Sequence, residues 1–488
     1  MPRIRQYLQG YRGFERDARV FLLGSLLASA AISLYWIDFN LYLAALGQDT
    51  ATIGLIATGS SLASALIAFP MSMLSDRIGR KLVLLLGGIF MLVALVGLLS
   101  TTALPLLWIF GAAYAAGQQT VGVIGSPFMT EHSAPGQRSE LFSLQFAIMQ
   151  LTSVGAGLLG GVVAAAASGP TGDAGVGVYR IILLVQLAFM LASLAVMTRL
   201  SRDRPVRAPR QVLERMRLRR PSLGVHITDR GTFARLLIPG FLISLGAGQI
   251  IPFLNLFVAG KFNVDLAGIS WIYALTSLGT MVAILLQPAI ANRYGKVASV
   301  VIVQGASIPF LVVLGFSPIL WTVILAMAVR NSLMNAGNPI QNAFAMERVR
   351  PEERAVLAAA MSALWALGWV IAGPYYSLLQ ATLGFTAGYA VGFVTIILLY
   401  SVATAMYWGW FHRTEASQLL AARIEAAASG SGGRPAALVV PGARSGSRTV
   451  PVDAGVVLAE AQAVFEAEEL LEAARMAAAG PGSTGRPD

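Results

Sequence analysis

The chain alternates between long apolar stretches and short polar loops. Each stretch holds about 20 or more mostly apolar residues, which is the length that an α-helix needs to cross the hydrocarbon core of a bilayer. The pattern therefore predicts twelve transmembrane helices. They cover residues 20–44, 51–74, 82–101, 105–129, 141–167, 178–198, 234–259, 266–290, 297–315, 319–345, 356–380 and 386–410.

The charges in the loops predict a topology. If the N-terminus is cytoplasmic, all five cytoplasmic loops contain arginine, whereas the outer loops carry little positive charge. An odd number of spans would destroy this asymmetry, so both termini are expected in the cytoplasm. The first apolar stretch is too long for a signal peptide and is expected to remain as the first span. The cytoplasmic loops are 75–81, 130–140, 199–233, 291–296 and 346–355.

We divide the chain into five segments on this basis. The first is a cytoplasmic N-terminus, and two six-helix bundles follow on either side of a basic linker. A cytoplasmic tail ends the chain, with a flexible Gly, Ser, Pro and Arg-rich part at 429–451 and an acidic, Ala-rich helix at 454–478. The segments are 1–19, 20–198, 199–233, 234–410 and 411–488.

Two charged patterns occur twice, and both copies are displaced by 216 residues. Asp76-Arg77-Ile78-Gly79-Arg80-Lys81 corresponds to Asn292-Arg293-Tyr294-Gly295-Lys296. Glu131, Pro135 and Arg138 correspond to Glu347, Pro351 and Arg354. A chain that carries the same loops twice in register was built from two copies of one unit. Internal duplication of a helical membrane unit is the architecture of secondary transporters.

Composition supports a membrane protein and excludes several functions. The hydrophobic fraction is 56% and the charged fraction 12%, whereas soluble domains carry about 25% charged residues. The chain has no cysteine and three histidines, so disulfides, thiol catalysis and cysteine metal sites are excluded and a histidine metal site is disfavoured. The sequence has no Walker A loop. We therefore predict no enzyme activity, no cofactor and no metal.

The net charge of +11 is concentrated in the linker, where eleven arginines lie between Arg199 and Arg235. A basic run of this kind can bind nucleic acid. It also follows from the excess of positive charge in cytoplasmic loops, and we prefer this explanation. No nucleic-acid partner is therefore expected.

The loop Ser72-x-Leu74-x-Asp76-Arg77-x-Gly79-Arg80-Lys81 resembles the signature between spans two and three of the major facilitator superfamily. Ser72 replaces the leading glycine of that signature, and Pro288 stands there in the second copy. The Glu-x6-Arg pairs resemble the loops after spans four and ten. The resemblance covers about residues 20–410. It implies an all-α membrane protein in which twelve transmembrane helices form two pseudo-symmetric six-helix bundles, usually as a monomer.

The resemblance also implies that these charged loops form a cytoplasmic gating network. The network latches the cytoplasmic side while the cavity faces outward, and its charges separate when the two halves rock. Asn292 replaces the acid in the second copy, so that latch is expected to be weaker. The alternative is ordinary topology-setting loop charge. The network residues are Asp76, Arg77, Gly79, Arg80, Glu131, Arg138, Arg293, Gly295, Glu347 and Arg354.

Spans one, four, seven and ten line the central cavity in the superfamily, and unusual polar residues occur in those spans here. Asp38 and Arg330 are the clear ionisable residues inside apolar spans, where each costs about 2.5–3.5 kcal/mol or more in lipid. In span seven, Gln249 and Asn255 lie about 120° apart around the helix, so at most one is central. The candidate cavity residues are Tyr35, Asp38, Tyr42, Tyr114, Gln118, Gln249, Asn255, Arg330, Asn331, Met334 and Asn338.

We expect Arg330 to anchor an anionic substrate group, or to pair with Asp38 when the site is empty. Asp38 is the candidate proton carrier, because burial disfavours the charged form of a carboxylate. Two alternatives remain. Asp38 can cap the outer end of span one at the headgroups, and Arg330 can have a structural hydrogen-bonding role within span ten.

Three functions are compatible with these features. The first is a proton-coupled antiporter that exports amphipathic or hydrophobic small molecules. Ala156-Gly157-Leu158-Leu159-Gly160-Gly161 resembles the Gly-Pro-x-x-Gly-Gly signature of drug–proton antiporters only in part, because the proline is absent. Close helix packing explains the same glycines. The second is a proton-linked importer of a small anion held by Arg330. The third is a non-transporting sensor that signals through residues 414–488.

The expected partners are a small-molecule substrate, protons and the lipid bilayer. We expect an integral protein of a bacterial plasma membrane.

Overall fold

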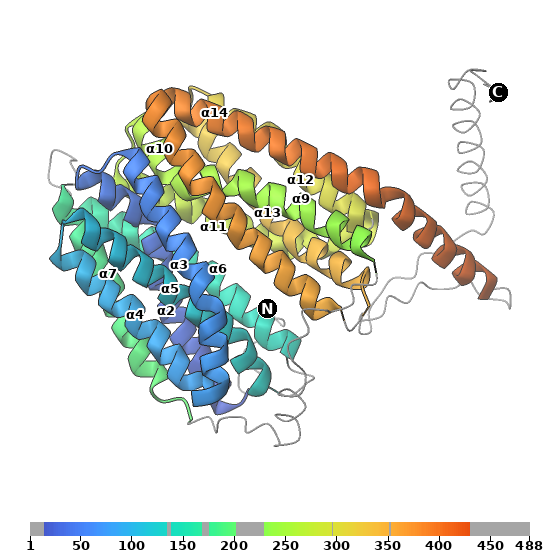
Figure 1. Ribbon diagram of the computed structural model, residues 1–488, viewed down its shortest axis with the longest axis horizontal. Coiled ribbons are helices and arrows are strands. Elements are labelled where there is room, and N and C mark those ends of the chain that lie inside the picture. Colours follow the sequence, from blue (N-terminus) through green and yellow to red (C-terminus); the bar gives the residue numbers. More distant parts are fainter. Residues whose placement is uncertain are drawn as a thin grey trace, which may run out of the picture. The chain divides into compact units, whose positions relative to one another are not determined.

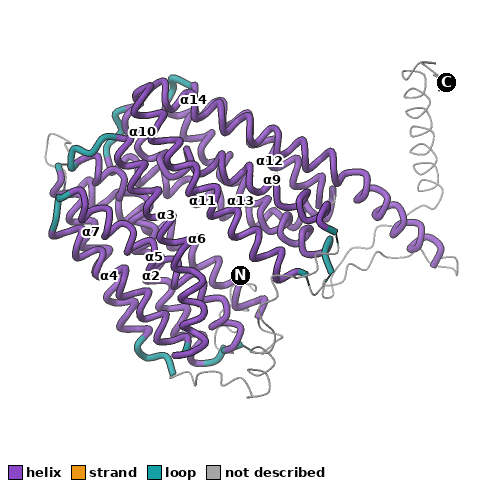
Figure 2. Tube along the Cα trace, in the orientation of Figure 1, coloured by secondary structure: helices purple, strands orange, loops and turns teal. Residues whose placement is uncertain are grey.

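The computed structural model describes residues 14–133, 138–167, 175–201, 229–294, 296–350 and 353–429. These residues are almost entirely helical, and short loops join the helices (Figures 1 and 2). The chain up to Gly409 forms one compact unit, and Trp410 begins a second unit that is described to Ser429. Residues 202–228 and 430–488 lie outside the described residues, so the acidic tail helix remains a prediction.

Six helices make up the first half, and local signals set their ends. Asp49 caps the start of the second helix by accepting a hydrogen bond from the Thr52 amide at 2.7 Å. Gly79 separates the second and third helices with φ at 98°, which favours glycine at this place in the charged loop. The helices are α2 (Arg16–Ala45), α3 (Thr50–Ile78), α4 (Arg80–Ser100), α5 (Leu104–Glu131), α6 (Arg138–Ala167) and α7 (Val176–Met197).

The second half repeats this order, except that a short 3₁₀ segment interrupts its first crossing and that its last two crossings form one continuous element. Asp229 caps its first helix and accepts hydrogen bonds from both the amide and the hydroxyl of Thr232, which hold the pKa of this carboxyl below its usual range. A short 3₁₀ segment, η1 (Ile251–Phe253), interrupts the predicted seventh span. The elements are α9 (Arg230–Ile250), η1, α10 (Leu254–Phe262), α11 (Leu266–Tyr294), α12 (Lys296–Phe316), α13 (Leu320–Glu347) and α14 (Arg354–Ser429).

The predicted spans eleven and twelve both lie within α14. Gly384 turns the chain between them with φ at 71°, a conformation that side chains disfavour. Taking α9 and α10 as one crossing and α14 as two, the described helices give twelve crossings. The all-α fold of twelve transmembrane helices is therefore confirmed.

Polar side chains interrupt the apolar runs of spans four and ten. Nine helical segments of the described residues are long and apolar enough to cross a membrane, and α5 and α13 are not among them. Gln118 and Gln119 interrupt the apolar run of α5, and α13 carries Arg330 and several amide side chains. Helices of this kind are expected to face protein or water rather than lipid.

Glycines bring helices of the two halves close together. A Cβ on Gly157 of α6 would lie 2.9 Å from both the Cβ and the amide nitrogen of Ala274 in α11. Gly160 and Gly161 face the same helix at Ser270 and Trp271. The glycine cluster of span five therefore serves close helix packing, which was the alternative to the antiporter signature.

Candidate functional site

A cavity of about 680 Å³ lies between the two halves. Helices α2, α3, α5 and α6 line it from the first half, and α9, η1 and the first part of α14 line it from the second. This volume suits a drug-sized molecule. The resemblance implied a lining from spans one, four, seven and ten, but the described walls come from spans one, two, four, five, seven and eleven. No described residue of α13 lines this cavity.

The two walls of the cavity differ in chemistry. The first half supplies hydroxyl and amide groups together with the aromatic side chains of Phe21, Tyr35, Trp36 and Phe39. Helix α3 alone contributes four hydroxyl side chains between Thr58 and Ser64. The second half supplies Pro252, Phe253, Trp365 and Trp369, together with small residues. No described residue that lines the cavity carries a charge.

Two asparagines close one end of the cavity by reciprocal hydrogen bonds between the halves. The side-chain amide of Asn40 in α2 donates to the Pro252 carbonyl at 2.6 Å, and that of Asn255 in α10 donates to the Ile37 carbonyl at 2.9 Å. Further hydrogen bonds between the halves, such as Thr50 to Gln380 at 3.3 Å, lie toward the same end. We call the two asparagine bonds the asparagine clamp.

The cavity extends from this clamp toward the opposite ends of the helices. Phe21 lies near the start of α2, Ser126 near the end of α5 and Gln145 near the start of α6, and all three line it. Among the described side chains, the hydrogen bonds between the halves gather from the middle of the helices to the clamp end.

Asp38 is buried inside the first half and does not line this cavity. Its side chain is 1% exposed, and both carboxylate oxygens accept from the Gln186 amide of α7 at 3.0 Å. The Gln186 carbonyl oxygen is buried without a hydrogen-bond partner. Asp38 therefore has one described side-chain partner, the neutral amide of Gln186, and it lies inside α2, which continues to Ala45.

The three tyrosines predicted for the cavity divide between two environments. Tyr35 lines the cavity and stacks on Tyr114, with ring centroids 3.7 Å apart. Tyr114 is fully buried behind it, and its hydroxyl has no partner. Tyr42 is also buried and donates to the Leu98 carbonyl at 2.9 Å. Of the three candidate residues of span one, Tyr35, Asp38 and Tyr42, only Tyr35 therefore lines the cavity.

The amides of spans four and seven follow the same pattern. Gln118 lines the cavity as expected. Gln249 is 1% exposed and does not line it, and its side-chain oxygen has no partner. Asn255 takes part in the clamp. Neither residue of span seven is a wall residue of this cavity, whereas Gly248 and Pro252 are.

Arg330 is buried in the second half and is 4% exposed. It donates from Nη2 to the Tyr400 hydroxyl of α14 at 2.8 Å, and its guanidinium carbon lies 5.6 Å from the centre of that ring. Its Nε has no hydrogen-bond partner. No ion pair joins Arg330 to Asp38 in this structure, because each side chain is held inside its own half. The expected pairing is therefore not formed.

The remaining span ten candidates bind neighbouring helices. Asn331 donates to the Thr280 hydroxyl of α11 at 2.9 Å, and the Met334 sulfur accepts from Ser307 of α12 at 3.3 Å. The side chain of Asn338 lies outside the described residues. These contacts give span ten a structural hydrogen-bonding role in this conformation.

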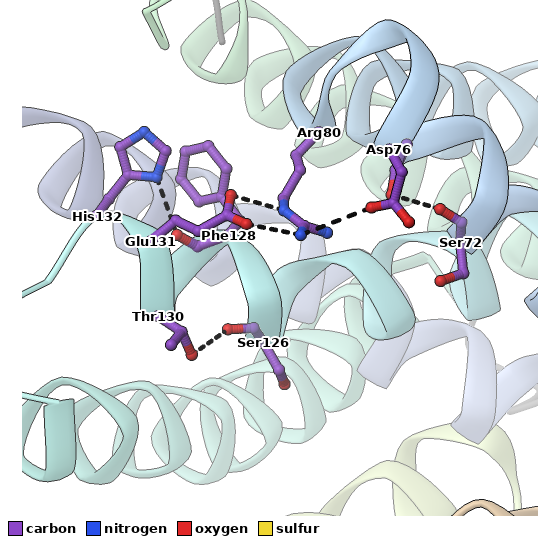
Figure 3. A network of polar contacts seen from close by, with 9 residues as sticks. Ser72, Asp76, Arg80, Ser126, Phe128, Thr130, Glu131 and His132 are labelled. Carbon is purple, nitrogen blue, oxygen red and sulfur yellow. Dashed lines mark hydrogen bonds and ion pairs between the residues drawn. The ribbon is translucent and has the colours of Figure 1, made fainter. Parts of the chain in front are cut away.

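The charged loop of the first half forms a network within that half. Arg80 donates from Nε and Nη2 to the two oxygens of Glu131, each at 2.6 Å, and its Nη2 lies 3.8 Å from Asp76 (Figure 3). The two parallel bonds from Arg80 to Glu131 hold the start of α4 against the end of α5, and Asp76 brings the end of α3 to the same place. Asp76 stays 68% exposed, and Arg77 is also exposed. A contact of this network with the second half remains a prediction.

The second copy is described only in part. Arg354 donates to the Met346 carbonyl at 2.8 Å and so caps the end of α13, beside the exposed Glu347. Gly295 and the side chains of Arg138 and Arg293 lie outside the described residues.

The serine stripe of span one was not predicted from the sequence. Ser25, Ser29 and Ser33 line the cavity four residues apart, and Asn40 continues the line. The regular spacing of small polar residues in an otherwise apolar helix was the available signal. It is weaker than the signal of an ionisable residue, because a serine hydroxyl can also bond to the backbone of its own helix.

Comparisons with known proteins agree on the fold. The sequence model described as Major Facilitator Superfamily matches residues 21–373. The solved nucleoside transporter NupG is 15% identical with a TM-score of 0.63, over 80% of this chain and 99% of that chain. The D-xylose-proton symporter is 14% identical with a TM-score of 0.64, over 80% and 96%.

A third solved structure, of a proton-dependent oligopeptide transporter, is 12% identical with a TM-score of 0.62, over 80% of this chain and 97% of that chain. Likeness at these identities supports the fold and not a substrate. The sequence matches none of the curated proteins with which it was compared.

Proposed function

The chain belongs to the major facilitator superfamily, and we propose that it exports amphipathic or hydrophobic small molecules in exchange for protons. It is an integral membrane transporter rather than an enzyme. The observation that carries the substrate part of the proposal is the uncharged cavity, which combines hydroxyl and amide groups from the first half with aromatic side chains from both halves. Such a cavity accommodates amphipathic molecules without leaving a charge unpaired.

The proposed cycle is alternating access between two conformations. The arginine content of the loops favours cytoplasmic termini in a bacterial plasma membrane. With that orientation, the asparagine clamp closes the outer side, and the cavity extends toward the cytoplasm. The structure would then represent the inward-facing state, in which an exporter takes up its substrate. The Arg80–Glu131–Asp76 network would meet the second half only after the cavity turns outward.

Asp38 is the proposed proton site. A buried carboxylate without a cationic partner is costly, and a bound proton removes that cost. Once protonated, Asp38 can also donate to the Gln186 side-chain oxygen, which is otherwise buried without a partner. Tyr35 and Tyr114 separate this site from the substrate, so protonation would act on the position of α2 rather than on the substrate directly.

An anion importer remains the second candidate because Arg330 is a buried cation whose Nε lacks a partner. For that function, the guanidinium would have to leave Tyr400 and reach the cavity.

Reconstituted full-length protein tests the proposal. Liposomes that contain a pH-sensitive dye receive chloramphenicol, uridine or phenyl β-D-glucopyranoside on the outside. An antiporter takes up one of these probes when the lumen is acidic, and protons leave as it enters. Uptake that requires an acidic exterior would show symport and refute export. Uptake that proceeds equally with an acidic lumen and with an acidic exterior would refute proton coupling.

A further inference from the structure

We propose, on the basis of the proposed transport function, that the cavity selects uncharged molecules that carry several hydroxyl groups and one flat ring. Nucleosides and aryl glycosides belong to this chemical class. The proposal narrows the amphipathic substrates considered above by excluding charged ones and purely hydrophobic ones.

The first argument concerns charge. The described walls hold no Asp, Glu, Lys, Arg or His side chain, and the nearest buried ionisable groups, Asp38 and Arg330, are each held by a neutral partner inside one half. An ionic group that enters such a cavity loses water and gains no counter-charge. Charged relatives of a substrate should therefore bind more weakly.

The second argument concerns hydrogen bonding. Ser25, Ser29 and Ser33 of α2 face the same cavity as the α3 hydroxyls and the amides of Gln118 and Gln150. Polar side chains are costly in a membrane protein unless they are paired or hydrated. Thr58 and Ser64 already donate to backbone carbonyls, but the amide groups of Gln118 and Gln150 need water or a polar ligand. A purely hydrophobic substrate would displace that water and leave these amides unpaired. A polyhydroxylated substrate replaces that water with hydrogen bonds of its own.

Two buried polar atoms in the walls have no partner. One is the Ser60 hydroxyl of the polar wall, and the other is the Trp369 indole nitrogen of the aromatic wall. Serine both donates and accepts, whereas the indole only donates. Both atoms are shielded from the cavity, so each can bond to a ligand only after its side chain rotates.

The third argument concerns the flat ring. Trp36 and Trp369 stand perpendicular to each other, with ring centroids 6.3 Å apart and an angle of 90° between the rings. They come from different halves and both line the cavity. A flat ring that stacks on one of them meets the edge of the other, which is a favourable aromatic arrangement. Trp365 and Phe253 extend the same wall.

Binding to the purified full-length protein tests this selection, measured by equilibrium dialysis with radiolabelled ligands. Two neutral probes, uridine and phenyl β-D-glucopyranoside, are compared with relatives that differ in charge. The anionic relatives are uridine 5′-monophosphate and phenyl β-D-glucuronide, and the cationic one is the 6-amino-6-deoxy derivative of the phenyl glucoside. Methyl β-D-glucopyranoside lacks the ring, and phenol lacks the sugar.

We expect at least one neutral probe to bind at least about tenfold more tightly than every charged relative of that probe. If the phenyl glucoside binds, its affinity should exceed those of methyl β-D-glucopyranoside and phenol by the same factor. Trp369→Leu should weaken binding of that probe about tenfold, through loss of stacking and of the indole donor. Trp321→Leu is the matched control, because that side chain is 75% exposed at the start of α13 and does not line the cavity.

Equal or tighter binding of a charged relative would overturn the selection proposal, and so would the absence of binding by both neutral probes at millimolar concentration. An unchanged affinity in Trp369→Leu would overturn the assignment of the aromatic wall. These results are distinguishable from failure of the proposed transport function. A protein that binds and moves charged compounds under a proton gradient is still an alternating-access transporter.

Discussion

At the residue scale, the two candidate functions depend on two buried ionisable side chains that the fold keeps apart. Asp38 lies between α2 and α7 against Gln186, and Arg330 lies between α13 and α14 against Tyr400. Asp38 in the first half and Arg330 in the second are therefore both buried without a partner of opposite charge. Burial of an unpaired charge is costly. Protonation of Asp38, or binding of an anionic ligand to Arg330, removes that cost and so changes the stability of the conformation that buries the charge.

Asp38→Asn should abolish the coupling of transport to protons but leave substrate exchange across the membrane. The amide keeps the shape and the hydrogen bond to Gln186 but cannot take up a proton. Gradient-driven accumulation should fall to the level of protein-free liposomes. Substrate exchange without a gradient should stay within about threefold, because the barrier changes by less than about 1 kcal/mol. Unimpaired accumulation in this variant would exclude Asp38 as the proton site.

Arg330→Ala and Tyr400→Phe separate a substrate anchor from a structural bond. If the guanidinium holds α13 to α14, both variants should lower the free energy of unfolding, Tyr400→Phe by about 1–3 kcal/mol, and both should retain transport at low temperature. If Arg330 binds an anionic substrate, its replacement should abolish transport while Tyr400→Phe remains active. Melting curves and uptake assays on both proteins distinguish the two roles.

The sequence indicated which residues were unusual more reliably than it indicated their partners. Asp38 and Arg330 stood out because charges are rare in apolar spans, and both are buried. Their partners depend on how each helix is rotated and which helix lies beside it. Nothing in the spacing of span one showed that Asp38 turns toward Gln186 while Trp36 and Asn40 turn toward the cavity.

At the scale of helices, the asparagine clamp and the glycine contacts govern how the halves meet. The 3₁₀ segment η1 interrupts span seven beside the clamp, and its Pro252 carbonyl accepts from Asn40. The pattern of apolar residues predicted a single helix here, because a short 3₁₀ turn keeps the apolar run intact. Pro252 was the available signal for the break.

Combined Asn40→Ala and Asn255→Ala should weaken the closed outer side. Two neutral hydrogen bonds contribute about 1–3 kcal/mol together, which corresponds to a shift of about 5–150-fold in the balance between the two conformations. A cysteine placed beside the clamp should then react faster with a membrane-impermeant thiol reagent added outside. The chain has no cysteine of its own, so the background is clean. An unchanged rate would show that the clamp does not hold the outer side closed.

Gly157→Leu should prevent the close contact of α6 with α11. A Cβ there would already lie 2.9 Å from the backbone of α11, so the helices must separate, and overpacking of this kind costs about 1–3 kcal/mol. We expect slower transport and a lower melting temperature. Gly155→Leu is the control, because a Cβ at Gly155 meets nothing within 4 Å. Equal effects in the two variants would contradict a specific contact at Gly157.

At the scale of the whole molecule, the fold was largely predictable and the conformation was not. The displacement of 216 residues between the charged loops, together with the positions of the arginines, is enough to indicate two six-helix halves. The side on which the cavity is closed depends on small differences between inter-half contacts. Such differences of a few kcal/mol are not visible in hydrophobic patterns.

The distances between the two halves test the central claim, that they rock to expose one cavity to alternate sides. In the proposed topology, spin labels at Thr102 and Pro318 report on the outer ends, and labels at Ile78 and Arg350 report on the cytoplasmic ends. All four lie at or beside the loops at those ends of the described helices. When Asp38→Asn or a change of pH shifts the equilibrium in liposomes, one distance should lengthen as the other shortens. Two distances that change in the same direction, or that both stay fixed while transport continues, would contradict alternating access.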